Sequence, residues 1–347
     1  MKYGIVRVED LVDAETIIDV RSPAEFAEDH LPGAINCPVL DNDERILIGT
    51  LYKQVSPFEA KKRGAILVAR NIARHIEAHF LERPKSWRPA IYCWRGGQRS
   101  GAMTTILRAI GWDARQVEGG YKAYRRQVVA DLETLPRQFR YRVLCGATGS
   151  AKSRILQAIG AVGEQIIDLE ALASHKGSVL GVLPDAPQPA QKMFDSLLIL
   201  ALRQLDPDRP VYVEAESRKI GRLQVPEAMI ESIRSGECFC VEAPVQARVD
   251  FLLRDYDYFL ENPVWLNERL DALKALRGGE TITRWQAHAT EGRWPELVSE
   301  LLESHYDPLY ERSQNRNYSG FGAPHVFTAS ALAPADIEVL ARAIVAT

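Results

Sequence analysis

The chain has 347 residues, 46% of them hydrophobic and 26% charged, and its formal net charge is −3. This length predicts two domains, and the composition is that of an ordinary globular protein rather than a membrane or disordered one. No apolar run approaches the ~20 residues that cross a bilayer, and no signal-peptide pattern opens the chain, so we expect a cytoplasmic protein. Five cysteines without a CxxC pair argue against a disulfide framework or a four-thiolate zinc site.

Strands and helices alternate through the first 134 residues. Two helix starts carry capping signals, Ser22-Pro23 with Glu25 and Ser56-Pro57 with Glu59. Short strands are predicted at 15–20, after a turn within 31–38, at 88–94 and at 114–120, and helices at 22–30, 56–83, 98–112 and 121–133. This alternation predicts a parallel sheet with its functional site at the carboxyl ends of the strands.

The stretch TLPRQFR, residues 134–140, interrupts the pattern and indicates a short inter-domain link. We therefore expect one domain over 1–134 and a second over 139–347. The second domain again alternates strand and helix, becomes mainly helical over about 245–313, and ends with a strand and a helix. The predicted fold class is thus α/β for both domains.

The first candidate site is the loop CWRGGQRSG, which follows the apolar strand residues 90–92. Backbone N–H groups of such a loop, with the start of a helix behind them, hold an anion and lower the pKa of a thiol at the rim. A buried strand thiol is the ordinary role of a cysteine, but the surrounding glycines and arginines favour a nucleophile here. The predicted site residues are Cys93, Arg95, Gly96, Gly97 and Arg99.

The second candidate site is GATGSAKS, residues 146–153, between a predicted strand and a predicted helix. It matches the phosphate-binding loop G-x-x-x-x-G-K-[ST], except that Ala151 replaces the last glycine. The residues expected to bind phosphate are Gly146, Thr148, Gly149, Ser150, Lys152 and Ser153. The alternative is a glycine-rich turn with an exposed lysine, which the strand–loop–helix order disfavours.

Acidic residues at neighbouring strand ends are candidates for holding Mg²⁺ or contacting a ligand. Glu214 and Glu216 follow the strand VYV, and either could instead pair with Arg218 or Lys219. Asp168 is equally compatible with a ligand contact and a strand-end cap. His175 and Lys176 could contact phosphate or form an exposed turn. Cys145 lies in an apolar strand and is expected in the core, whereas Cys238 and Cys240 alternate on a strand and are expected in the core or partly exposed.

Two stretches of the N-terminal part, DVRSPAEFAEDHLPGAINCP and GWDARQVEGGYKAY, resemble the signatures of the rhodanese family over about residues 5–130. The resemblance implies that Cys93 carries or attacks a chalcogen atom. The spacing Cys93-x5-Arg99 is similar instead to the longer loop of rhodanese-fold phosphatases, although Tyr92 stands where those enzymes place a histidine. The loop alone leaves sulfur, selenium and phosphate chemistry open.

The order of motifs along nearly the whole chain resembles the tRNA 2-selenouridine synthase family. The motifs are CWRGGQRSG, GATGSAKS, DLEALASHKGS, VYVEAESRKIG and HYDPLYERS. The resemblance implies a transferase that replaces sulfur by selenium in wobble 2-thiouridine of tRNA. It also implies selenophosphate as selenium donor and geranyl diphosphate as alkyl donor for an S-geranyl intermediate. No tightly bound cofactor is expected, and Mg²⁺ is a possible addition.

Two alternatives stay open at this point. One is a rhodanese-fold phosphatase or sulfurtransferase fused to a kinase-like domain, and the other is a non-catalytic tRNA-binding scaffold. A tRNA partner gains weak support from the arginines at 125, 126, 137, 140 and 142. Trp265, Trp285 and Trp294 could stack on bases or cover a geranyl chain, but the helical core is the favoured place for them.

Overall fold

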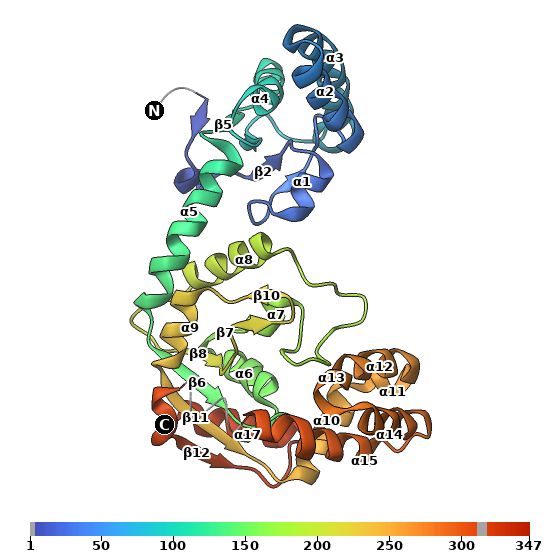
Figure 1. Ribbon diagram of the computed structural model, residues 1–347. Helices are drawn as coiled ribbons and strands as arrows, with labels where there is room; N and C mark the ends of the chain where they lie inside the picture. The colour runs from blue at the N-terminus through green and yellow to red at the C-terminus, as the bar shows by residue number, and fades with distance from the viewer. Residues whose placement is uncertain (1–3, 311–317) are drawn as a thin grey trace. The chain divides into compact units, whose positions relative to one another are not determined.

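The computed structural model describes residues 4–310 and 318–347 and divides the chain into two compact units. The N-terminal unit comprises Met1–Asp131 with Asp195–Leu197, and the C-terminal unit comprises Leu132–Phe194 with Leu198–Thr347. Each unit is built on its own five-stranded sheet (Figure 1). Within the described residues, no helix is long and apolar enough to cross a membrane.

The N-terminal unit contains a parallel sheet in the order β1-β5-β4-β2-β3. The strands are β1 (Ile5–Val6), β2 (Thr16–Asp19), β3 (Ile35–Asn36), β4 (Pro89–Tyr92) and β5 (Arg115–Val117). The central strand β4 is buried along its whole length. Fully buried side chains such as Ile18, Ile91 and Met103 form the core, each contributing about 1.5–3 kcal/mol.

The helices of this unit mostly follow the predicted pattern. They are η1 (Val8–Asp13), α1 (Pro23–Glu28), α2 (Asn42–Gln54), α3 (Pro57–His75) with the π-turn η2 (Ile76–Phe80), α4 (Gln98–Ile110) and α5 (Gly120–Thr134). The capping box of Ser22 with Glu25 is confirmed. Helix α2 was not predicted, although Asp41 and Glu44 form a complete capping box at its start. It packs against α3.

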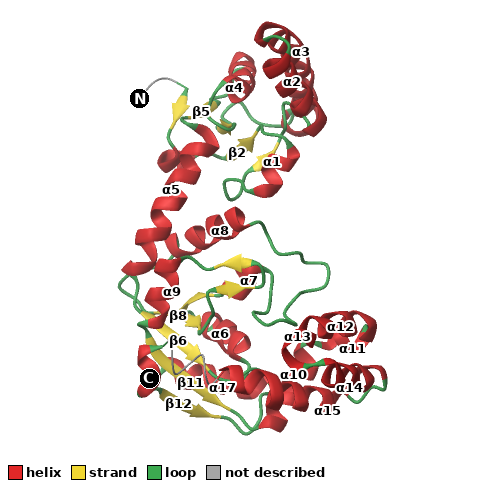
Figure 2. Cartoon of the chain, in the orientation of Figure 1, coloured by secondary structure: helices red, strands yellow, loops and turns green. Residues whose placement is uncertain are grey.

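The C-terminal unit contains a second parallel sheet, in the order β12-β11-β6-β8-β7. Its strands are β6 (Tyr141–Cys145), β7 (Gln165–Ile167), β8 (Val211–Glu214), β11 (Glu237–Glu242) and β12 (His325–Thr328). A small antiparallel hairpin, β9 (Lys219–Ile220) with β10 (Leu223–Gln224), stands apart from it. The α/β class predicted for both parts of the chain is therefore confirmed (Figure 2).

Helices of the C-terminal unit cover the sheet and then form a separate helical cluster (Figure 1). Those near the sheet are α6 (Lys152–Ala161), α7 (Leu169–Ala173), α8 (Gln191–Arg203), α9 (Glu227–Arg234) and α17 (Pro334–Val345). The cluster comprises α10 (Val245–Asp255), α11 (Asp257–Glu261), α12 (Pro263–Leu270), η4 (Asp271–Leu273), α13 (Lys274–Arg277), α14 (Gly279–Thr290), α15 (Trp294–Leu301) and η5 (Leu302–Tyr306). It has an apolar core of its own, with Trp285 fully buried. The motif HYDPLYERS extends past the described residues at 311.

Candidate functional site

Cys93 lies directly after β4, at the carboxyl end of the central strand of the N-terminal sheet. The loop behind it is shaped by two glycines with positive φ angles. A Cβ on Gly96 would lie 2.6 Å from the Val117 carbonyl oxygen, and one on Gly120 would lie 2.2 Å from the Cys93 carbonyl oxygen. Any side chain at either position would displace the backbone that curves around the thiol.

The Cys93 sulfur lies inside a ring of hydrogen-bond donors. The backbone N–H of Gly97 donates to the sulfur at 3.3 Å, and the Ser100 hydroxyl donates at 3.2 Å. Burial alone raises the pKa of the Cys93 thiol, but hydrogen bonds from the Ser100 hydroxyl and from backbone N–H groups outweigh it, so that the pKa is lowered. A thiol with a lowered pKa beside a helix start is more often in the thiolate form, which is the nucleophilic form of cysteine.

A second layer of contacts holds this ring in place. The Gln116 side chain donates through Nε2 to the carbonyl oxygens of Gly96 and Gly97, at 2.7 and 2.9 Å, and to the Ser100 hydroxyl at 2.8 Å. The predictions from sequence missed both Gln116 and Ser100. Ser100 could have been found, because it lies in the first turn of α4, where hydroxyls can face the loop.

The two predicted arginines of the loop differ in their surroundings. Arg95 is exposed. Arg99 donates to both carboxylate oxygens of Glu25, at 2.8 and 3.4 Å, and this contact lowers the pKa of the half-buried Glu25. Arg99 is therefore anchored at the rim of the loop by a partner 74 residues away. The catalytic roles assigned to both arginines stay predictions.

We expect the Ser100→Ala variant to raise the pKa of Cys93, because the largest hydrogen bond to its thiolate is lost. The thiolate form would then appear at higher pH than in the unaltered protein. Ultraviolet thiolate absorbance, with the Cys93→Ser protein subtracted, measures this titration. An unchanged midpoint would show that the backbone N–H groups alone set the pKa.

The second predicted site lies at the carboxyl end of β6, the middle strand of the C-terminal sheet. Gly146 and Gly149 adopt positive φ angles of 150° and 82° in the loop that leads into α6. Lys152 turns its ammonium group back onto the loop and donates to the Gly146 carbonyl oxygen at 2.8 Å. Ser150 Oγ is buried and has no hydrogen-bond partner among the described residues. Thr148, Lys152 and Ser153 line a pocket over this loop, where the loop N–H groups and the helix start suit an anion.

Ala151, which replaces the last glycine of the motif, adopts the left-handed conformation with φ of 60° and ψ of 23°. For a residue with a Cβ this conformation costs roughly 1–2 kcal/mol. The methyl group is 97% buried in the core between α6 and the sheet, which offsets part of that cost. Ala151 therefore keeps the left-handed backbone conformation that glycine adopts readily, and the loop bends as it would with glycine at this position.

Three glutamates gather beside Lys152 and Ser153. Carboxylate oxygens of Glu170, Glu214 and Glu216 lie within 4.8 Å of one another, and Glu170 Oε2 accepts from the Ser153 hydroxyl at 3.1 Å. Burial, followed by repulsion between the carboxylates, raises the pKa of Glu170. One oxygen of Glu214, Oε1, is buried and has no hydrogen-bond partner in the part of the chain that the structure describes. A divalent cation fits such a set of oxygen donors.

Two of these glutamates were predicted, and Glu170 was missed. Asp168 instead caps α7, accepting from the Ala171 N–H at 2.8 Å, and it is not among the three clustered carboxylates. Arg218, considered as a partner for the glutamates, pairs with Glu227. The ligand role of Asp168 stays a prediction, although its side chain is engaged in capping.

Residues from distant parts of the chain hold the phosphate loop. Arg248 of α10 donates to the Thr148 carbonyl oxygen at 3.1 Å and pairs with Asp307 at 2.7 Å. The Tyr310 hydroxyl accepts from the Gly146 N–H at 2.5 Å. Lys176 pairs with Asp255 at 2.7 Å and lies over the Tyr256 ring. Arg248 and Tyr310 were not predicted, because their contacts arise only when the helical cluster packs on the loop.

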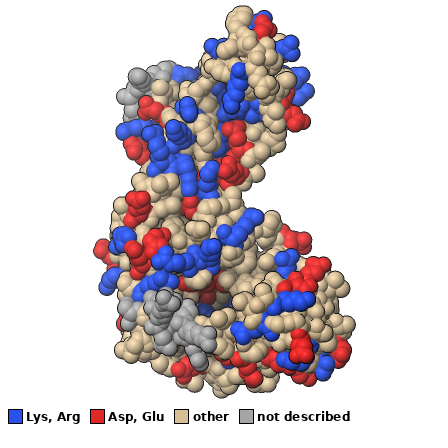
Figure 3. Space-filling model, in the orientation of Figure 1, with Lys and Arg blue, Asp and Glu red and all other residues tan. Residues whose placement is uncertain are grey.

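Arg137 and Arg142, two of the five arginines considered for tRNA, have protein partners, whereas Arg126 is exposed. Arg137 pairs with Glu231 at 2.6 Å, and Arg142 donates to the Tyr212 hydroxyl at 2.6 Å. Figure 3 shows Lys and Arg side chains gathered on the N-terminal unit near the place where Figure 1 draws α5. Over the helical cluster of the C-terminal unit, positive and negative side chains are mixed. Neither pattern by itself identifies a tRNA surface.

The remaining sequence expectations concern cysteines and tryptophans. Cys145, Cys238 and Cys240 are buried, as expected of core residues. Trp285 is also a core residue, because its ring is fully buried. Trp265 packs against Phe259 with ring centroids 4.7 Å apart, whereas Trp294 lines a cavity near the phosphate loop.

Comparisons with known proteins match both units. Residues 6–127 match the rhodanese-like domain family, and residues 139–265 match the tRNA 2-selenouridine synthase AAA domain. The tRNA 2-selenouridine synthase of Nitrosomonas europaea is 35% identical over 77% of this chain and 70% of its own length.

Two further relatives, also named tRNA 2-selenouridine synthase, match over more of the chain. The protein of Shewanella denitrificans is 32% identical over 86% of this chain and 88% of its own length. That of Marinobacter nauticus is 30% identical over 90% and 92%. With the activated thiol, the phosphate loop and their order along the chain, these likenesses show that the chain belongs to the tRNA 2-selenouridine synthase family.

Proposed function

We propose that this tRNA-modifying enzyme works in two steps, with geranyl diphosphate and then selenophosphate as substrates. The observation that carries the proposal is the pairing, in one chain, of a thiol with a lowered pKa and a phosphate loop beside clustered carboxylates. Each site suits one of the two phosphate-containing substrates. The same sites on a phosphatase or a kinase would not account for the family likeness.

The first step takes place at the phosphate loop. The sulfur of wobble 2-thiouridine attacks C1 of geranyl diphosphate, the C1–O bond breaks, and the electron pair leaves with diphosphate. The pyrimidine loses its N3 proton, so the S-geranyl product is neutral. Lys152, Ser153 and the loop N–H groups stabilise the charge that develops on the leaving diphosphate. No ATP hydrolysis is needed, because diphosphate is itself the anion that the loop holds.

The second step takes place at Cys93. The Cys93 thiolate attacks phosphorus of selenophosphate, the phosphorus–selenium bond breaks, and hydrogen selenide leaves. The hydrogen selenide adds to C2 of the S-geranyl base, the C2–S bond breaks, and geranylthiol leaves with a proton. Water then hydrolyses the phosphocysteine and releases phosphate. The donors around Cys93 suit the tetrahedral selenophosphate anion. Mass analysis of the acid-quenched Cys93 peptide should detect the phosphocysteine.

We further propose that Glu170, Glu214 and Glu216 hold a Mg²⁺ ion when diphosphate is bound. The buried oxygen of Glu214, which lacks a partner among the described residues, supports this assignment, since a cation would satisfy it. Bound Mg²⁺ would supply positive charge for the leaving diphosphate. Lys152 lines the same pocket and would contact the same diphosphate.

Mass spectrometry of nucleosides from thiolated tRNA tests both proposals. With geranyl diphosphate alone, the purified enzyme should form S-geranyl-2-thiouridine, and added selenophosphate should convert it to 2-selenouridine. Removing Mg²⁺ with a chelator should slow the first step at least about tenfold, because a charge on the leaving group is lost, while pre-geranylated tRNA should still be selenated. Selenation of thiolated tRNA without any prenyl donor would contradict the two-step order.

A further inference from the structure

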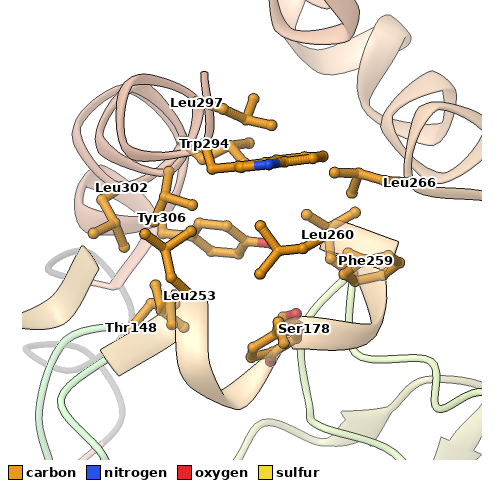
Figure 4. Close-up of a pocket in the computed structure, with 15 residues that line it drawn as sticks. Thr148, Ser178, Leu253, Phe259, Leu260, Leu266, Trp294, Leu297, Leu302 and Tyr306 are labelled. Atoms are coloured by element: carbon orange, nitrogen blue, oxygen red, sulfur yellow. The ribbon is translucent and has the colours of Figure 1, made fainter. Parts of the chain in front are cut away.

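The C-terminal unit contains a second, narrow cavity of about 80 Å³, between the phosphate loop and the helical cluster. Its walls are almost wholly apolar, and they come mainly from α10, α11, α15 and η5 (Figure 4). The apolar lining residues include Leu253, Phe259, Leu260, Leu266, Trp294, Leu297 and Leu302.

This cavity adjoins the phosphate pocket. Five residues line both: Thr148, Ser178, Leu252, Tyr256 and Tyr306. Thr148 belongs to the phosphate loop itself. Lys152 and the three clustered glutamates line only the phosphate pocket. The polar phosphate pocket and the apolar cavity are therefore neighbours. A diphosphate group suits the phosphate pocket, and a hydrocarbon chain suits the apolar cavity.

The two ends of the apolar cavity differ. In Figure 4, Thr148 and Ser178 lie at one end, and the Trp294 indole spans the opposite end with Leu297 behind it. Leu260 lies between the two ends, and Leu266 lies beside the edge of the indole. Trp294 is the first residue of α15 and is followed by Pro295. Because the proline ring fixes its own φ angle at a helical value, it favours the start of the helix at this point.

We propose that this cavity binds the hydrocarbon chain of the prenyl diphosphate and that Trp294 limits the chain to ten carbons. The inference rests on the proposed S-geranylation and adds to it the place of the chain and the residue that selects its length. The head of the substrate lies at the phosphate loop, C1 lies at the residues that line both the pocket and the cavity, and the chain runs toward Trp294. The apolar walls exclude water from the chain.

Selectivity follows from the closed end. In this proposal, a fifteen-carbon chain with its diphosphate on the same loop would have to pass Trp294, whereas a ten-carbon chain would end before it. One methylene too many or too few in a hydrophobic pocket changes specificity by about 10- to 200-fold. The Trp294→Ala change removes the end wall. Leu260→Trp instead fills the middle of the cavity and leaves the end wall intact.

Calorimetric binding of geranyl diphosphate, farnesyl diphosphate and inorganic diphosphate to the full chain tests the proposal. The unaltered protein should bind geranyl diphosphate more than about tenfold tighter than either inorganic diphosphate or farnesyl diphosphate. Trp294→Ala should improve farnesyl binding at least about tenfold. Leu260→Trp should weaken geranyl binding by a similar factor. Both variants should bind inorganic diphosphate as before, which also shows that they are folded.

Trp265→Ala is the matched control. It removes the same side chain from the same helical cluster, but Trp265 does not line the cavity, so the geranyl to farnesyl ratio should stay unchanged. The proposal is overturned if geranyl diphosphate binds no tighter than inorganic diphosphate, or if neither cavity variant changes the ratio. Tight geranyl binding without transfer to thiolated tRNA would refute the proposed function and leave the prenyl site standing.

Discussion

Replacing Cys93 with serine is expected to abolish 2-selenouridine formation while S-geranyl-2-thiouridine still accumulates. The serine hydroxyl stays protonated at neutral pH, whereas the hydrogen bonds around Cys93 favour the thiolate. Losing a nucleophile typically lowers a rate by several orders of magnitude, so we expect a drop of at least about 10³ in selenation. The phosphate loop belongs to the other compact unit, so the geranylation rate should change less than about twofold.

Nucleoside mass spectrometry of the reacted tRNA measures both products in one sample. Cys37→Ala is a suitable control, because Cys37 is a buried thiol of the same unit whose pKa is raised to about 12 by burial. It should support both steps if the protein is folded. If the Cys93→Ser enzyme makes 2-selenouridine at the normal rate, the assigned role of Cys93 is wrong.

Lys152→Ala is expected to stop both steps when the reaction starts from 2-thiouridine. A charge-assisted hydrogen bond to phosphate contributes about 1.5–3 kcal/mol, which is roughly tenfold or more in affinity for geranyl diphosphate. The loss in rate should be larger, because the charge on diphosphate grows as the C1–O bond breaks. Lys274→Ala, at an exposed lysine of the same unit, controls for the loss of one positive charge.

Because geranylation precedes selenation in the proposed reaction, pre-geranylated tRNA should restore selenation by the Lys152→Ala enzyme. Supplied with pre-geranylated tRNA and selenophosphate, the Lys152→Ala enzyme should recover most of its selenation, because the leaving group is already in place. Cys93→Ser should not recover. A folded, tRNA-binding Lys152→Ala enzyme that stays inactive on geranylated tRNA would mean that Lys152 also serves the selenium step. An absolute requirement for ATP in geranylation would show that the loop holds a nucleotide instead.

Local sequence rules determined much of this protein. The alternation of apolar strands with capped helices predicted the parallel sheet of the N-terminal domain and the α/β class of both domains. The two loops were located by glycines that only a tight strand-to-helix turn requires. Helix α2 could have been predicted from the same rules, because the Asp41 and Glu44 capping box acts over three residues. These signals are readable because caps and turns depend on neighbours within one or two helical turns.

Tertiary structure decided which side chains meet. Arg99 binds Glu25 from 74 residues away, and Glu170 rather than Asp168 joins the other two glutamates because α7 turns the chain after β7. Trp294 and Trp285 follow the same helical pattern, yet one lines the cavity beside the phosphate loop and the other fills the core. Periodicity shows only that a face is buried, whereas the sheet order and the packing of α10 and α15 decide what lies against it.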